Sequence, residues 1–146
     1  MLRIVHNLGR RMLSITQFSA CPTNGAVLGP APIDPAWIRG GNPVARNLVI
    51  AGSTDRSAWT ILWDCTAGKF EWRYTVDETV HILEGGVTVC ADGTTKTLGP
   101  GDVAYFPAGS IANWHVENYV RKIAFCQKPD PMIFALPLRV MRKIFG

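Results

Sequence analysis

Glu78 is the residue whose type and position most directly offer acid–base chemistry in the middle of the chain. Trp72 and Tyr74 precede it at even spacings, so in extended backbone the three side chains share one face. A carboxylate among aromatic rings must be paired, protonated or hydrated, because burying a bare charge is costly. We therefore treat Glu78 and Tyr74 as candidate catalytic residues that could transfer a proton.

Further aromatic residues and one lysine could complete a pocket around Glu78. Trp63 and Trp114, with Trp59 as an addition, would supply flat apolar walls, and Lys122 could anchor a substrate carboxylate or pair with Glu78. This composition is typical of a small-molecule site and equally typical of a filled β-barrel core. Both interpretations stay open at this point.

The non-functional alternative is an ion pair of Glu78 that merely ties strands together. Its candidate cations are Arg73, Arg121 and Lys122. Since neighbouring residues of a strand point to opposite faces, only one of Arg121 and Lys122 can enter the pocket. We expect Lys122 inside and Arg121 at a solvated edge.

The two histidines of the central region are predicted to lie outside such a pocket. His81 has the opposite parity to Glu78, and His115 follows Trp114, which we expect to point inward. A metal site built from Glu78, His81 and His115 is therefore the weakest of the hypotheses.

Charge and hydropathy exclude two classes of partner. The net charge of +4 comes from the ends of the chain, because residues 34–135 hold nine basic and eleven acidic residues, a balance of −2. That balance argues against a nucleic-acid partner. The sequence has no run of 18 apolar residues, so it predicts no membrane-spanning helix. Low charge combined with 14 aromatic residues predicts apolar surface buried between two subunits, hence a homodimer. The pocket around Glu78 predicts a small-molecule ligand.

The cysteines and the first residues bear on location. Cys21, Cys65, Cys90 and Cys126 form no CxxC pair, so we expect reduced thiols in a cytoplasmic protein. Residues 1–20 carry arginine, serine and threonine without an acid, as organelle transit peptides do. Translation from Met12 and a plain basic extension are the alternatives.

The chain divides into a Pro/Gly-rich arm over 1–41, a β domain over 42–130 and a tail over 131–146, with a short helix expected within Met132–Phe145. Turns at Glu84-Gly85-Gly86 and Ala91-Asp92-Gly93 predict three hairpin-linked strands. Short strands without intervening helices indicate an all-β sandwich or barrel. The predicted strands are Asn47–Ala51, Ala58–Cys65, Lys69–Thr75, Thr79–Leu83, Val87–Cys90, Thr94–Leu98, Val103–Phe106, Ile111–Val116 and Val120–Cys126.

Two stretches resemble the paired motifs of the cupin superfamily. Gly68–Gly85 resembles the first motif, and Leu98–Gly109, with its Pro-Gly-Asp turn, resembles the second. Trp63–Trp72, together with Asn113–Val116 and Arg121-Lys122, resembles the small single-domain cupins related to ureidoglycine aminohydrolase. The resemblance covers about residues 42–126 and implies a double-stranded β-helix, the jelly-roll barrel. For the aminohydrolase it implies manganese chemistry.

The metal-ligand positions of the motifs depart from that pattern. Where metal-binding cupins carry histidines, this chain has Trp72, Tyr74 and Ala112, and only Glu78 matches. One carboxylate does not hold a transition metal tightly, so we expect no metal cofactor. The resulting hypothesis is a small-molecule-binding cupin, acting as a metal-independent enzyme on a ureido or carboxylate metabolite. The alternative is a non-catalytic ligand-binding or sensing dimer.

Overall fold

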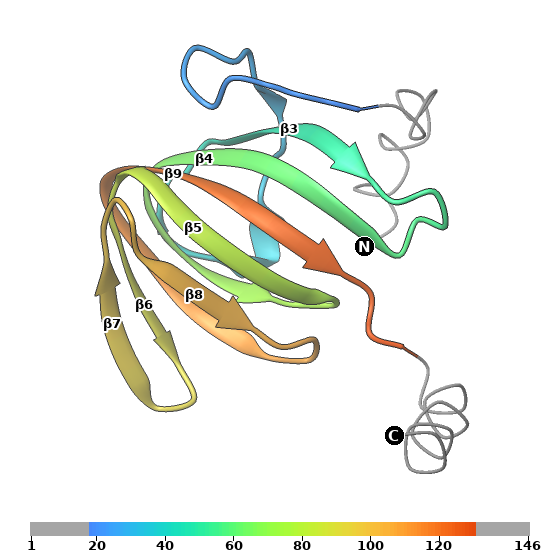
Figure 1. Cartoon of the computed structure of the whole chain (residues 1–146). Coiled ribbons are helices and arrows are strands. Elements are labelled where there is room, and N and C mark those ends of the chain that lie inside the picture. Colours follow the sequence, from blue (N-terminus) through green and yellow to red (C-terminus); the bar gives the residue numbers. More distant parts are fainter. Residues whose placement is uncertain (1–17, 131–146) are drawn as a thin grey trace, which may run out of the picture.

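A computed structural model describes residues 18–130 of the chain (Figure 1). The helix expected within Met132–Phe145 and all but the last three residues of the basic segment 1–20 lie outside these residues. The elements, in order, are β1 (Gly29–Pro30), the 3-10 turn η1 (Pro35–Trp37), β2 (Ile38–Gly41), β3 (Ala45–Gly52), β4 (Ala58–Arg73), β5 (Asp77–Gly85), β6 (Val87–Ala91), β7 (Thr94–Leu98), β8 (Val103–Phe106) and β9 (Ile111–Gln127).

Two long strands, β4 and β9, run through both layers of the fold. They pair with each other along nearly their whole length, and the halves that contain Ala58 and Gln127 lie in a sheet with the order β1-β3-β4-β9-β5-β8. The remaining half of β4 pairs with β2, and the remaining half of β9 pairs with β6, which pairs with β7. The two antiparallel sheets enclose one core, as expected for an all-β cupin jelly roll.

The length of β4 and β9 corrects the strand prediction. Each was expected as two strands, but a register shift between Thr66 and Gly68 lets β4 bend without ending. Gly68 is needed there because a Cβ atom would lie 2.6 Å from the Pro43 ring. Sequence runs alone cannot distinguish a bend within a strand from a break between two strands.

One of the two predicted hairpins is present. Asp92 and Gly93 have positive φ angles of 50° and 72° and connect β6 to β7. The hairpin expected at Gly85-Gly86 is wrong, because β5 pairs with β8 and β9, and β6 with β7 and β9. Gly85 instead carries the chain from one sheet to the other, and a Cβ atom there would lie 2.0 Å from the Tyr119 carbonyl oxygen.

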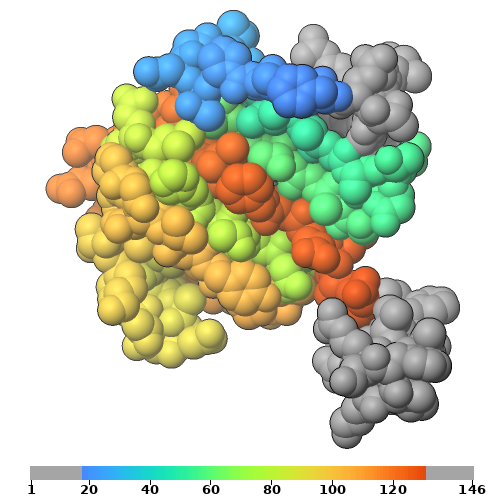
Figure 2. Space-filling view, in the orientation of Figure 1, coloured from blue at the N-terminus to red at the C-terminus, as the bar shows by residue number. Residues whose placement is uncertain are grey.

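The arm before β3 closes one side of the barrel. Ile33 is buried in the core, and the ring of Trp37 packs edge-on against Trp72 at 5.5 Å between centroids. Figure 2 shows the residues of the arm, in blue, lying across one end of the sheet that contains β9. Within residues 18–130, no helix is long and apolar enough to cross a membrane.

Candidate functional site

The barrel interior holds an ion pair between Glu78 of β5 and Lys122 of β9. Lys122 Nζ donates to Glu78 Oε1 at 2.5 Å, and the residues are 5% and 7% exposed. Glu78 lies opposite Cys126 in the β5–β9 ladder, four residues beyond Lys122, so the two side chains point to the same face of the sheet. Lys122 is thus the inward residue of the Arg121-Lys122 pair, as alternation predicts, and it neutralises Glu78.

Two indole rings complete the surroundings of the Lys122 ammonium group. Its Nζ lies 5.0 Å from the ring centroid of Trp63 and 5.0 Å from that of Trp114. Trp63 is the strand neighbour of Lys122 on β4, and both rings are buried. Cation–π attraction of this kind stabilises an ammonium group that has lost its water. The cation is therefore held by one carboxylate and two aromatic faces.

Tyr74 lies inside the barrel as predicted and accepts a hydrogen bond. Trp114 Nε1 donates to the Tyr74 hydroxyl oxygen at 3.2 Å, and the Tyr74 ring stacks on Phe106 at 4.4 Å between centroids. Burial, followed by the nearby Glu78 carboxylate, holds the pKa of Tyr74 well above its usual value. Tyr74 is therefore a neutral phenol near pH 7, suited to giving a hydrogen bond rather than to acting as a base.

A buried thiol touches the free side of the carboxylate. Cys126 Sγ donates to Glu78 Oε2 at 3.9 Å. Burial, together with the Glu78 charge, raises the pKa of Cys126 to about 12. Burial likewise raises the pKa of Cys65 to about 12. Both groups therefore remain neutral thiols near pH 7 and are poor nucleophiles.

The remaining predicted residues divide between the inside and the outside of the barrel. Trp72 is partly buried beside Trp63, at 6.1 Å between ring centroids. His81 and His115 lie on outer faces, opposite Ile123 and Lys69 respectively, as parity predicts.

Two predicted cations fall elsewhere. Arg73 pairs with Glu71 at the surface, so it plays no part in neutralising Glu78. The expectation of a solvated edge for Arg121 is wrong, because this residue is only 9% exposed. The burial of Arg121 cannot be predicted from the local sequence, because residues distant in the chain cover this side chain.

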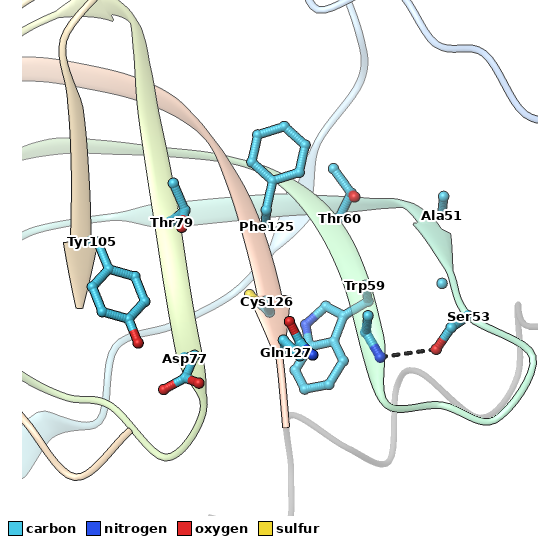
Figure 3. A pocket seen from close by; sticks show the side chains of 12 residues that line it. Ala51, Ser53, Trp59, Thr60, Asp77, Thr79, Tyr105, Phe125, Cys126 and Gln127 are labelled. Carbon is cyan, nitrogen blue, oxygen red and sulfur yellow. Dashed lines mark hydrogen bonds between the residues drawn. The ribbon is translucent and has the colours of Figure 1, made fainter. Parts of the chain in front are cut away.

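Among the described residues, a cavity of about 450 Å³ includes Cys126, whose thiol contacts Glu78, but neither Glu78 nor Lys122 lines it (Figure 3). Cys126 and Trp59 belong to its wall, and Asp77, Tyr105 and Gln127 lie around them. The sequence pointed to Trp59 only as an addition and missed Asp77, Tyr105 and Gln127. Their only signal was their position beside Glu78 and Cys126 at the strand ends.

A second cavity, of about 290 Å³, opens on the other sheet. Lys69, Asn113, His115 and Thr88 line it together with Trp114. Glu78 and Lys122 line neither cavity, and the rings of Trp63 and Trp114 lie against the Lys122 ammonium group.

The residues at the motif positions do not fit a metal ion. Trp72, Tyr74 and Ala112 stand where a metal-binding cupin has histidines, and the Lys122 ammonium group occupies one oxygen of Glu78. Among residues 18–130, no group of three His, Cys, Asp or Glu side chains could hold an ion. We therefore derive no chemical step through a metal.

Comparisons with known proteins identify the fold family. A EutQ-like cupin domain model matches residues 52–124, half of the 146-residue chain. No curated protein matches. The Clostridium difficile EutQ structure is 19% identical, with a TM-score of 0.53 over 61% of this chain and 71% of that one.

Two other solved structures share the architecture. A protein of unknown function of the DUF861 family from Pseudomonas syringae is 24% identical, with a TM-score of 0.65 over 70% of this chain and 45% of that one. A cupin superfamily protein from Desulfitobacterium hafniense is 20% identical, with a TM-score of 0.51 over 58% and 78%. At these identities the structures show a common fold, and the matched residues show that this chain belongs to the EutQ-like cupin domain family.

Proposed function

We propose that the protein binds a small polar metabolite carrying a carboxylate or ureido group, without a metal. The observation that carries this proposal is the buried Glu78–Lys122 ion pair. Well-packed apolar residues usually stabilise a core at least as well as a buried ion pair does. A barrel that needed only a filled interior would have no use for these two charges, which favours a role for them in recognition.

The route to the pair is the cavity beside Cys126. A ligand there would contact Trp59 and Cys126 directly, and its carboxylate would compete with Glu78 for the Lys122 ammonium group. Release of Glu78 would leave a carboxyl group able to accept or give a proton, with Tyr74 as a nearby donor. Under this proposal Lys122 anchors the ligand, and Trp63, Trp72 and Trp114 form apolar walls. Ureidoglycine aminohydrolase-like turnover is the finer form of the hypothesis.

A screen of small carboxylates and ureides against the full chain tests binding. Thermal unfolding should show stabilisation by one class, and that stabilisation should be lost in Lys122→Gln and kept in Lys96→Gln, an exposed lysine on β7. If Lys122→Gln reduces the stabilisation by none of the compounds, the ligand lies elsewhere and the proposal is overturned. The absence of stabilisation by either class would overturn it as well.

A second candidate function is a non-catalytic module whose barrel is simply filled. The observation favouring it is that Glu78 is already satisfied, by Lys122 and by the Cys126 thiol, among rings in mutual contact. Glu78→Gln separates the two candidates. An enzyme would lose turnover of its ligand with little loss of stability, whereas a purely structural Glu78 would show its whole effect in the unfolding free energy.

We also propose that two copies associate through the outer face of the sheet containing β9. Val103 and Tyr105 of β8 and Phe125 of β9, the two strands that flank β5, expose large apolar surface, with Phe125 49% exposed. A second copy covering them would also border the cavity beside Cys126. Sedimentation velocity should give a dimer that Phe125→Lys converts to a monomer. A monomeric wild type would refute this association.

A cytoplasmic location is part of the same proposal. Its support is the four cysteines among residues 18–130, all of them free thiols. Free thiols persist where the surroundings are reducing. Fractionation of cells producing the full chain should find it in the cytosolic fraction, and recovery from an organelle would favour the transit-peptide alternative.

A further inference from the structure

A row of four charged residues crosses the outer face of the sheet, on the opposite side of β9 from Lys122. The residues are directly paired from strand to strand, so their side chains share one face. From β3 through β4 and β9 to β5 the row consists of Arg46, Asp64, Arg121 and Glu84. None of them takes part in the function proposed above.

Asp64 is already satisfied without Arg121. Arg46 donates through Nε to Oδ1 at 3.0 Å and through Nη2 to Oδ2 at 2.5 Å. The Tyr119 hydroxyl donates to Oδ2 at 2.9 Å. Burial and the hydrogen bond to Asp64 raise the pKa of Tyr119, while Arg121 opposes that rise, so the phenol stays protonated and donates at neutral pH. Three donors thus fill most of the acceptor positions of this carboxylate.

Arg121 is left as an unmatched buried cation. Its Nε and Nη2 atoms are shielded from solvent, and no atom of residues 18–130 accepts a hydrogen bond from either. A buried charged donor without a partner costs the full desolvation of that group. Native proteins seldom leave such a group unsatisfied, so these two donors point to an acceptor supplied from outside the fold.

The identity of the two unpaired atoms specifies the geometry of that acceptor. Nε and Nη2 form the side-on edge of a guanidinium group, and Arg46 uses the same two atoms on the two oxygens of Asp64. This edge matches two oxygens of one carboxylate or phosphate group. A neutral carbonyl group or a single water molecule would have to accept both donors on one oxygen, which is a weaker match than two oxygens of an anion.

The neighbouring carboxylate does not supply the acceptor. Glu84 lies opposite Arg121 in register, but its side chain is exposed to solvent and makes no ion pair within the described part of the chain. A carboxylate on the surface of a second copy is also a poor fit, because Arg121 is covered by its own chain. Either acceptor needs the covering residues to move, and a small free ion needs a smaller displacement than a side chain fixed to another folded surface.

We propose that Arg121 anchors a binding site for a small oxyanion, a carboxylate or a phosphate, on the outer face of this sheet, with Tyr119 and Arg46 beside it. Figure 2 shows this face of the molecule, with β9 in orange-red running through it and the arm across one end. The bound oxygens would accept from Nε and Nη2 together, repeating the arrangement of Arg46 on Asp64. The site is separate from Glu78 and Lys122, because Arg121 and Lys122 point to opposite faces of β9.

Thermal unfolding of the full chain in sodium acetate, sodium phosphate and sodium chloride at matched ionic strength tests the site. Acetate or phosphate should raise the Tm saturably, by roughly 5 °C at about ten times Kd, above the chloride control. The acetate and phosphate arms show which oxyanion is preferred. Arg121→Gln should abolish the rise, whereas Lys96→Gln should preserve it. A rise no larger than in chloride, or one that survives Arg121→Gln, would overturn the proposal.

A measurement on the wild type covers the case in which Arg121→Gln does not fold. The Arg121 Nε–H resonance in a ¹H–¹⁵N spectrum should shift saturably on titration with the preferred anion, while the Arg73 resonance stays in place. An unmoved Arg121 resonance would refute the site. In the Phe125→Lys variant, stabilisation that depends on protein concentration and not on the anion would show that a second copy supplies the acceptor, which would also overturn the proposal. Neither result bears on Lys122 and its ligand.

Discussion

The inner and outer faces of the same sheet accommodate buried charged side chains in different ways. Inside, Lys122 and Glu78 form a closed pair, with Trp63 and Trp114 taking the place of water around the ammonium group. Outside, Asp64 is matched by Arg46 and Tyr119 and leaves the Arg121 fork unpaired. Lys122 and Arg121 are adjacent in β9 but have contrasting electrostatic environments. Glu78 neutralises Lys122, whereas two donors of Arg121 have no acceptor among residues 18–130.

The largest expected effect comes from opening the interior pair. Lys122→Met should lower the free energy of unfolding by about 3–5 kcal/mol, because it leaves the Glu78 carboxylate buried without a cation. Urea unfolding at pH 7 measures the loss. The double variant Lys122→Met, Glu78→Leu should recover most of it, since both charges are then gone. A double variant as unstable as Lys122→Met would mean that packing, and not charge, makes Lys122 important.

Removal of the Asp64 charge should have the next largest effect. Asp64→Asn should cost about 1–3 kcal/mol, because an amide cannot accept from both donors of Arg46 and from Tyr119 at once. Arg46→Gln should cost less, since half of the Arg46 side chain is exposed. Urea unfolding of both variants gives the comparison. The reverse order would show that the Arg46 side chain, and not the Asp64 charge, contributes most of the stability of this network.

A smaller effect concerns the buried thiols of the interior. The pKa of Cys65 and of Cys126 is about 12 in the fold, above an ordinary value of 9.0. The neutral thiols therefore favour the folded state fully below pH 9, and this contribution is lost as the pH rises from 9 towards 12. The wild type should lose roughly 1 kcal/mol per thiol per pH unit above pH 9, relative to Cys65→Ala, Cys126→Ala. Parallel stability curves for the two proteins would contradict this.

The smallest effect sharpens the contrast between the two faces. Glu84→Gln should leave the urea midpoint unchanged within error, because Glu84 is exposed and makes no ion pair within residues 18–130. A clear destabilisation would show that Glu84 is the acceptor of Arg121 in solution. The oxyanion site would then have to be abandoned.

Alternation along strands and the motif turns carried most of the correct predictions. They predicted an all-β fold, the β6–β7 turn at Asp92-Gly93, and the inward positions of Glu78, Trp114 and Lys122, while the resemblance of the two motifs predicted the cupin fold. These features are local, because the parity of a strand and a positive φ angle depend on neighbouring residues in sequence.

Features set by distant strands were missed. The bend at Gly68 depends on Pro43 packing against it, and the burial of Arg121 depends on neighbouring strands. The chain passes from one sheet to the other at Gly85, where the backbone lies too close to the Tyr119 carbonyl group for any side chain. The roles of Glu78 and Tyr74 in proton transfer remain predictions.

The most direct test of the central claim, that the interior site works with an ion pair in place of a metal, is the metal content of the purified, untagged full chain. Plasma mass spectrometry after expression with added manganese, zinc, iron and nickel should find far less than one equivalent of each, because Lys122 holds the single motif carboxylate. Nearly one equivalent of any of these metals, lost in Glu78→Gln, would contradict the account.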